Sequence, residues 1–240
     1  MQARIPPAPD PAAPAGFWAR YAAWSLDAAL LLPLVALLCA TKVGRAATEA
    51  QHALQAIADA MPQVIDAALG SAQTPVGLAR QLLVDPALAD AAARLQSALG
   101  TIVFTPLLVY AMLSLPWAVL FEASAWQATP GKRALGLQVT DAGGRRLKAG
   151  HALLRHLSAG LSWLTLNIGH ALALMPPAHL ALHDHVSGTR VVRRAGVARM
   201  APWARLWLVA QGVAMLVAIA WLLVWLQSAM QAAMQQALGL

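Results

Sequence analysis

The chain has 240 residues, of which 59% are hydrophobic and only 11% are charged. A soluble domain usually carries about a quarter charged residues, so this composition excludes an ordinary soluble protein and is typical of a membrane protein. The formal net charge of +7 does not predict a nucleic-acid partner, because the basic residues gather just outside apolar runs, which is the positive-inside pattern of membrane proteins.

Residues 1–15 form a Pro- and Ala-rich tail without apolar periodicity and are predicted to be disordered. Residues 16–40 follow with an apolar run that reaches the roughly 20 residues needed to cross a bilayer. We expect a retained spanning helix rather than a cleaved signal peptide, because the run is too long and contains Asp27. The single cysteine, Cys39, excludes an intramolecular disulfide.

Residues 41–99 form a long insert between two apolar runs. Their apolar side chains recur at steps of three and four, which predicts amphipathic helices, with breaks near Pro62, Pro75 and Pro86. The insert carries no excess of basic residues, so we expect it on the extracytoplasmic side. A second spanning helix is predicted over residues 101–121.

The loop after the second span is rich in Lys and Arg and is therefore predicted to be cytoplasmic. Within it, residues 137–140 alternate in polarity, and the pattern resumes after a glycine-containing turn at residues 141–144. This arrangement predicts a small β-hairpin. Residues 189–194 have a similar strand pattern, and we expect them to pair with residues 137–140 as a third strand on the same side of the membrane.

The apolar run over residues 156–178 is interrupted by polar residues and by Pro176-Pro177. If this run crossed the membrane, the five arginines that follow it would lie on the outer side, against the positive-inside pattern. We therefore expect a re-entrant or broken helical segment, with a full crossing as the alternative. Non-helical backbone at membrane depth requires protein around it.

Together, these elements predict an all-α membrane protein with three spanning helices and a re-entrant or broken helical segment. A small cytoplasmic β-hairpin or three-stranded sheet and a helical extracytoplasmic insert complete the expected fold. The membrane core is expected over residues 16–40 and 100–200. Residues 201–240 would add a further transmembrane helix, centred on the apolar run 203–226, and a C-terminal tail.

Two charged residues in the first span need a physical explanation, because a charge near the middle of a membrane helix costs about 2.5–3.5 kcal/mol. Arg20 and Asp27 share one helical stripe, about 10.5 Å apart along the axis, which is too far for direct contact. We expect Arg20 to pair with Asp184 near the inner interface, so that exchanging the two charges would partly preserve the pair. Asp27 would then need a cation, a proton, or hydrogen bonds from Asn167, His170 or the backbone nearby.

Other candidate sites are weaker. His179, His183 and His185 lie close in sequence, but no cysteine or further ligand completes a metal site. Lys132 and Arg133 are expected to contact lipid phosphates at the bilayer surface. The chain shows no cofactor motif and no nucleophile beside a base at a diagnostic spacing, so we do not expect an enzyme.

Short motifs in the right order resemble the RDD family of bacterial membrane proteins, which is named for one Arg and two Asp. The family's arginine and first aspartate correspond to Arg20 and Asp27, and its second aspartate corresponds to Asp184. The supporting motif residues are Gly131, Lys132, Gly136, His183, Gly188 and Thr189. The resemblance implies a multi-pass protein of the bacterial inner membrane, in a family for which transport, including ion/proton antiport, has been suggested.

Three functions remain open from the sequence. The first is a transporter or transporter subunit that couples H⁺ or Na⁺ through Asp27. The second is a non-catalytic membrane module that docks an unknown protein partner through its outer insert or its basic cytoplasmic face, with the charged residues holding the helices together. The third, an intramembrane enzyme, has the least support. The expected partners are the lipid bilayer and, because three or so spans are few for a transport path, further copies of the chain.

Overall fold

The computed structural model describes residues 13–70, 85–165, 167–197 and 199–238. Its elements are mostly helices, with a small two-stranded sheet. Two compact units can be distinguished. Unit 1 comprises Met1–Leu32 and Met112–Leu216, and unit 2 comprises Pro33–Ala111 and Val217–Leu240.

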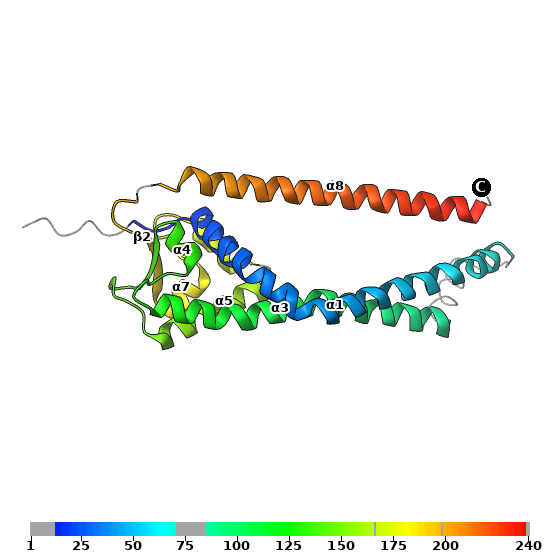
Figure 1. Cartoon of the computed structure of the whole chain (residues 1–240), viewed down its shortest axis with the longest axis horizontal. Helices are drawn as coiled ribbons and strands as arrows, with labels where there is room; N and C mark the ends of the chain where they lie inside the picture. Colours follow the sequence, from blue (N-terminus) through cyan, green and yellow to red (C-terminus); the bar gives the residue numbers. More distant parts are fainter. Residues whose placement is uncertain (1–12, 71–84, 166, 198, 239–240) are drawn as a thin grey trace, which may run out of the picture. The chain divides into compact units, whose positions relative to one another are not determined.

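Three long helices dominate the chain, and their bounds are α1, Phe17–Gly70, α3, Pro86–Ala123, and α8, Pro202–Leu238 (Figure 1). Each contains an apolar stretch long enough to cross a membrane. The three predicted spans lie within these helices, so the number and place of the long apolar helices are confirmed. Which side of a membrane each helix end faces stays a prediction.

The described parts of the insert are helical and continue the long helices. Residues 41–70 belong to α1, which runs through Pro62 without the expected break, because the surrounding Ala- and Gln-rich sequence favours a helix. Pro86 opens α3, and the side chain of Asp85 caps it by accepting the amide of Ala87 at 2.9 Å. The expected break at Pro75 lies outside the described residues.

The interrupted apolar run forms a bent pair of helices rather than one straight helix. It begins within α5, Ala149–Leu164, and continues through α6, Ile168–Ala171, and the 3₁₀ turn η1, Leu172–Leu174. The two helical directions differ by 115°. The change of direction falls at Asn167, whose φ of 65° is left-handed. A broken span and a re-entrant hairpin both fit this bend, and re-entry stays a prediction.

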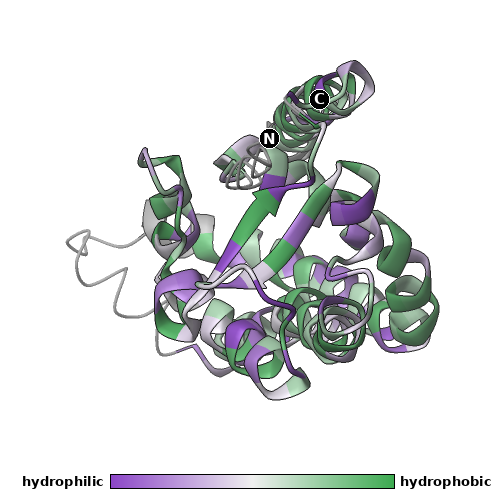
Figure 2. Ribbon diagram, turned by 90° about the vertical axis from the view of Figure 1, so that its left-hand side faces the viewer, coloured by the Kyte–Doolittle hydropathy of each residue, from purple (hydrophilic) through white to green (hydrophobic). Residues whose placement is uncertain are grey.

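The sheet contains β1, Leu137–Asp141, and β2, Thr189–Arg193, which pair antiparallel with Val139 opposite Val191. This is the pairing expected between residues 137–140 and 189–194. Both strands mix hydrophobic and hydrophilic residues, as Figure 2 shows, and their inward side chains are buried.

The third strand expected from the hairpin is missing among the described residues. After the turn the chain makes a single bridge, between Thr140 and Arg146, because the segment enters α5 only a few residues later. The other edge of β2 is instead covered by the end of the N-terminal tail. The amide of Ala15 donates to the carbonyl of Val191 at 2.9 Å, and that of Arg193 donates to Ala13 at 2.8 Å. Residues 13–15, which we expected to be disordered, are therefore ordered by the sheet.

The core of unit 1 lies between this sheet and the first turns of α1. Leu137, Val139 and Val191 are fully buried, and they meet the small side chains of Ala22 and Ala23. Two short helices lie nearby, α4, Pro130–Ala134, and α7, Leu182–Ser187, and Figure 1 shows both grouped with α5 and β2. Small residues on α1 let its backbone approach α4 closely, which positions the site described next.

Candidate functional site: a buried charge network

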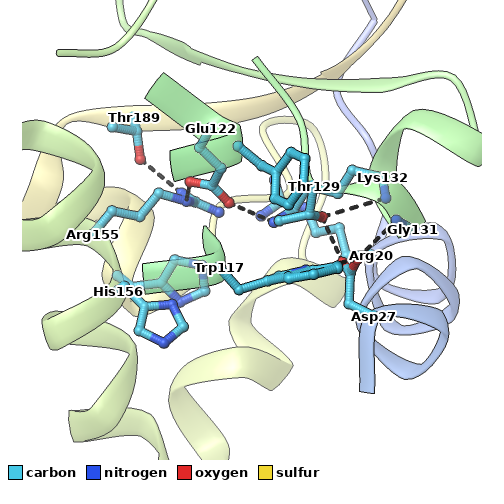
Figure 3. A network of polar contacts seen from close by, with 12 residues as sticks. Arg20, Asp27, Trp117, Glu122, Thr129, Gly131, Lys132, Arg155, His156 and Thr189 are labelled. Atoms are coloured by element: carbon cyan, nitrogen blue, oxygen red, sulfur yellow. Dashed lines mark hydrogen bonds and ion pairs between the residues drawn. The ribbon is translucent and has the colours of Figure 1, made fainter. Parts of the chain in front are cut away.

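Asp27 lies on α1 and is only 6% exposed. Its carboxylate accepts the backbone amide of Gly131 at 2.8 Å, the hydroxyl of Thr129 at 2.5 Å and the indole N–H of Trp117 at 3.3 Å. Figure 3 shows these groups converging on Asp27 at the start of α4. Three donors satisfy a buried carboxylate that would otherwise be costly.

The start of α4 is built to meet this carboxylate. Thr129 is the N-cap residue and Pro130 follows at the first helical position, which is the usual order at a helix start. A Cβ at Gly131 would overlap the carbonyl oxygen of Ala23, far inside the 3.0 Å that real Cβ atoms respect. Only glycine therefore allows α4 to pack on α1 with its amide directed at Asp27.

Arg20 pairs with Asp184 on α7, as the sequence suggested. Its Nε also donates to the carbonyl of Ala15 at 2.8 Å. Asp184 is 1% exposed and accepts, in addition, the amide of Ala181 at 2.9 Å. The pair therefore joins α1, the start of α7 and the segment that covers the sheet.

Arg155 lies on α5, is 5% exposed and connects the two halves of the site. Its Nη1 donates to Asp184 and, at 2.7 Å, to the hydroxyl of Thr189, and its Nε lies 3.4 Å from Glu122. The other oxygen of Glu122 accepts from Nζ of Lys132 at 2.5 Å. In Figure 3, Glu122 lies between Arg155 and Lys132.

These contacts form one network, which we call the charge network. It runs from α1 through α7, α5, the end of α3 and α4, and returns to α1. Its charged members are Arg20, Asp27, Glu122, Lys132, Arg155 and Asp184. The network contains three cations and three carboxylates, so its formal charges balance, with Asp27 held by hydrogen-bond donors and the other two carboxylates by cations. Buried charges are stable only with such partners and hydrogen bonds.

The charge network also fixes the protonation of two groups on α7. Burial alone would raise the pKa of Asp184, but the guanidinium groups of Arg155 and Arg20 outweigh it and hold that pKa well below the usual range. Burial is the main reason that the pKa of His183 falls to about 2, and the positive charge of Arg155 adds to the effect. Asp184 is therefore ionised and His183 neutral at neutral pH.

The neutral His183 predicts a loss of stability in mild acid. Its folded pKa of about 2 lies below the ordinary value of about 6.5, so between these values the unfolded chain binds a proton that the folded chain does not. Lowering the pH from 7 to 5 is expected to cost about 2 kcal/mol of the free energy of unfolding through this residue. Unfolding curves at several pH values should show this loss, and His183→Gln should remove it. His151→Gln, at an exposed position, is the control, and an equal loss in the His183→Gln variant would contradict the prediction.

Several sequence predictions need correction at this site. Asp27 bonds with the start of α4 and not with Asn167, His170 or the backbone near the bend. Lys132 is directed at Glu122 rather than at lipid phosphate, and Arg133 lies over the ring of Trp126, 4.5 Å from its centre. Lys132 therefore contacts protein, whereas lipid contact of the exposed Arg133 stays a prediction.

The remaining motif residues shape the backbone around the charge network. Gly136 and Gly188 have φ values of 65° and 61°, in the left-handed region that favours glycine. Gly188 ends α7, directly before the hydroxyl of Thr189 that binds Arg155. His183 packs against the ring of His170, with centroids 5.2 Å apart. Within the described ranges, no group of three or more His, Cys, Asp or Glu residues could hold a metal ion.

Sequence reasoning missed Arg155, Glu122, Thr129 and Trp117. In the sequence Arg155 is one of several Lys and Arg residues after the second span, although a lone arginine in an apolar helix is itself a signal of a buried partner. Glu122 had a similar signal, as the first carboxylate after a long apolar run. Nothing in the sequence alone indicated that Trp117 would meet Asp27.

The fold and the charge network define a helical membrane protein in which a compact polar assembly joins the ends of apolar helices. The pattern of the RDD family matches residues 14–188, and the chain belongs to this family. A relative in Bacillus subtilis (strain 168), named Uncharacterized protein YxaI, is 33% identical over 93 residues, which is 38% of this chain. The match spans 61% of that relative's length. No solved structure gives a significant match.

Proposed function

We propose that this protein is a non-catalytic module of the bacterial inner membrane that crosses the bilayer more than once and assembles with a protein partner or with further copies of itself. The observation that supports this proposal is the balanced charge network. Each of its carboxylates has a cation or several hydrogen-bond donors already in place. Such an arrangement holds helices in one geometry and leaves no carboxylate that needs an external ion.

The apolar surface of α8 supports the assembly part of the proposal. In the most apolar 18 residues within Pro202–Ala232, no side chain is buried within the chain. The first turns of α8 contact α1, where Trp207 donates to the hydroxyl of Ser25 at 3.0 Å, and Ala204 is buried there. The rest of this stretch offers its apolar side chains to lipid or to a neighbouring helix. Docking through the outer insert or the basic cytoplasmic face belongs to the same proposal.

Transport coupled to H⁺ or Na⁺ through Asp27 is the second candidate. The observation that favours it is a carboxylate, 6% exposed, inside a helix long enough to cross a membrane. A carrier must release the donors that hold this carboxylate each time it takes up an ion, which here means separating α4 from α1. A non-catalytic module does not require this separation of α4 from α1, and we therefore rank it above a transporter.

Asp27→Asn separates the two candidates. Asparagine can still accept from Gly131, so the variant is expected to remain folded and in the membrane. The purified protein would be reconstituted in vesicles that contain a pH-sensitive dye, and Na⁺ and H⁺ gradients would be imposed. For a module, we expect wild type, Asp27→Asn and protein-free vesicles to give the same flux. A flux in wild type that Asp27→Asn abolishes would establish transport and refute the module proposal.

A further inference from the structure

Unit 2 contains a basic pocket between the later turns of α1 and the first turns of α3. Its volume is about 440 Å³. Buried Ala46 and Ala98 lie at its base, where small side chains let the helices approach and leave a hollow between longer neighbours. The polar side chains that line it are Lys42, Arg45, Glu49, Arg94, Ser97 and Thr101. We call this hollow the basic pocket.

The charges around the basic pocket are unbalanced, in contrast to the charge network of unit 1. Three cations face one carboxylate, that of Glu49. Arg94 pairs with Asp90 one turn away, but both side chains are more than half exposed, and such pairs are weak. In the described part of the chain, Lys42 and Arg45 have no ion pair. The pocket therefore attracts an anion.

The lining also offers one neutral donor. Ser97 and Thr101 lie one turn apart on α3, and both residues line the pocket. The hydroxyl of Thr101 already donates to the backbone carbonyl of Ser97 at 3.0 Å, whereas Ser97 is an exposed residue with a hydroxyl that can donate. Cationic side chains with nearby hydroxyls are the groups that bind phosphate oxygens in proteins.

The pocket lies where both helices change from apolar to polar sequence. Lys42 lies two residues after the first apolar run, and Thr101 begins the second. Leu38 and Phe104, at the neighbouring ends of those runs, are 57% and 70% exposed. If the apolar runs cross the bilayer, the pocket lies at the level of the lipid headgroups, with apolar side chains beside it for acyl chains. A Lys or Arg near an anionic headgroup at the bilayer surface contributes about 1 kcal/mol of electrostatic attraction.

We propose that the basic pocket binds a phosphate group carrying net negative charge. An anionic phospholipid such as phosphatidylglycerol and free inorganic phosphate are the two sources of this chemistry. The proposal concerns the basic pocket of unit 2 and does not depend on the proposed function, which rests on the charge network and on the apolar surface of α8.

The test measures the thermal unfolding midpoint of the full chain in a neutral detergent at low salt. Phosphatidylglycerol, phosphatidylcholine with the same acyl chains, and inorganic phosphate would each be titrated. Ligand that binds the folded state raises the midpoint. We expect phosphatidylglycerol to raise it more than phosphatidylcholine does. If inorganic phosphate raises the midpoint as much as phosphatidylglycerol does, the ligand is a free anion. If inorganic phosphate leaves the midpoint unchanged, the ligand is the lipid headgroup.

Charge variants locate the site. Each basic residue near an anionic group contributes about a fivefold factor in affinity, so Lys42→Gln with Arg45→Gln is expected to weaken phosphatidylglycerol binding about 25-fold. Glu49→Gln removes the opposing charge and is expected to strengthen binding about fivefold, which keeps the test valid if the double variant does not fold. Arg190→Gln, an exposed arginine of unit 1, is the matched control. Equal midpoints with both lipids and with phosphate, or a Glu49→Gln variant that binds like wild type, would overturn the proposal.

Discussion

An Asp184→Asn variant is expected to lose about 3–5 kcal/mol of its free energy of unfolding. Asparagine keeps the size of the side chain and can still accept the amide of Ala181, so the change isolates the charge. Without that charge, the guanidinium groups of Arg20 and Arg155 remain buried beside a neutral group. An uncompensated buried charge costs far more than a lost hydrogen bond does.

The measurement is unfolding in mixed micelles with increasing SDS, and Asp141→Asn is the matched control. Asp141 also pairs with an arginine, Arg145, but that arginine is 84% exposed. The carboxylate of Asp141 further accepts the amide of Arg145 at 2.8 Å, which asparagine can reproduce. We expect this control to unfold like wild type. An Asp184→Asn variant as stable as the control would show that the charge network contributes little to stability.

The contacts of Asp184 also determine the expected effect of exchanging its charge with that of Arg20. An isolated pair of Arg20 and Asp184 would tolerate Arg20→Asp combined with Asp184→Arg, which was the expectation from the sequence. In the structure Asp184 also binds Arg155, so an arginine at position 184 would face a buried guanidinium group. The double variant is therefore expected to be no more stable than Asp184→Asn, and recovery to near wild type would contradict the shared role of Arg155.

The sequence was sufficient to pair Arg20 with Asp184 because both charges sit beside apolar segments and had few alternative partners. The sequence was insufficient to predict the partners of Arg155. The positive-inside pattern assigns a basic loop to one side of the membrane, but it does not indicate which cation of the loop is buried in the protein. That choice depends on the crossing of α5 over α7, a tertiary arrangement that leaves no local pattern.

The long helices and the antiparallel strand pair were predictable for a different reason. Apolar length fixes a candidate span, and alternating polarity fixes a strand with one buried face. The predicted third strand does not form beyond a single bridge at Arg146, because the chain begins α5 at Ala149, only three residues later. Composition could not predict that residues 13–15 are ordered, because they are held by hydrogen bonds to the edge of β2.

Among the glycines that the structure describes in unit 1, Gly131 is the one at which an added methyl group is expected to disrupt the site most. The new Cβ would overlap the carbonyl oxygen of Ala23 and would lie 3.0 Å from the carboxylate carbon of Asp27. Because the obstacle is helix backbone rather than a flexible side chain, α4 must move away from α1. Overpacking of this kind costs about 1–3 kcal/mol, and the lost hydrogen bond to a charged acceptor adds about 1.5–3 kcal/mol.

We therefore expect Gly131→Ala to lower the free energy of unfolding by about 3–6 kcal/mol, measured by the same SDS titration. Gly160→Ala is the matched control, because a Cβ on that residue of α5 would meet nothing within 4 Å and alanine favours the helix by up to about 1 kcal/mol. The control should be at least as stable as wild type, although both variants add the same methyl group. If Gly131→Ala had the same free energy of unfolding as the control, α4 could not approach α1 as closely as described. The hydrogen bond from the amide of Gly131 to Asp27 would then be wrong as well.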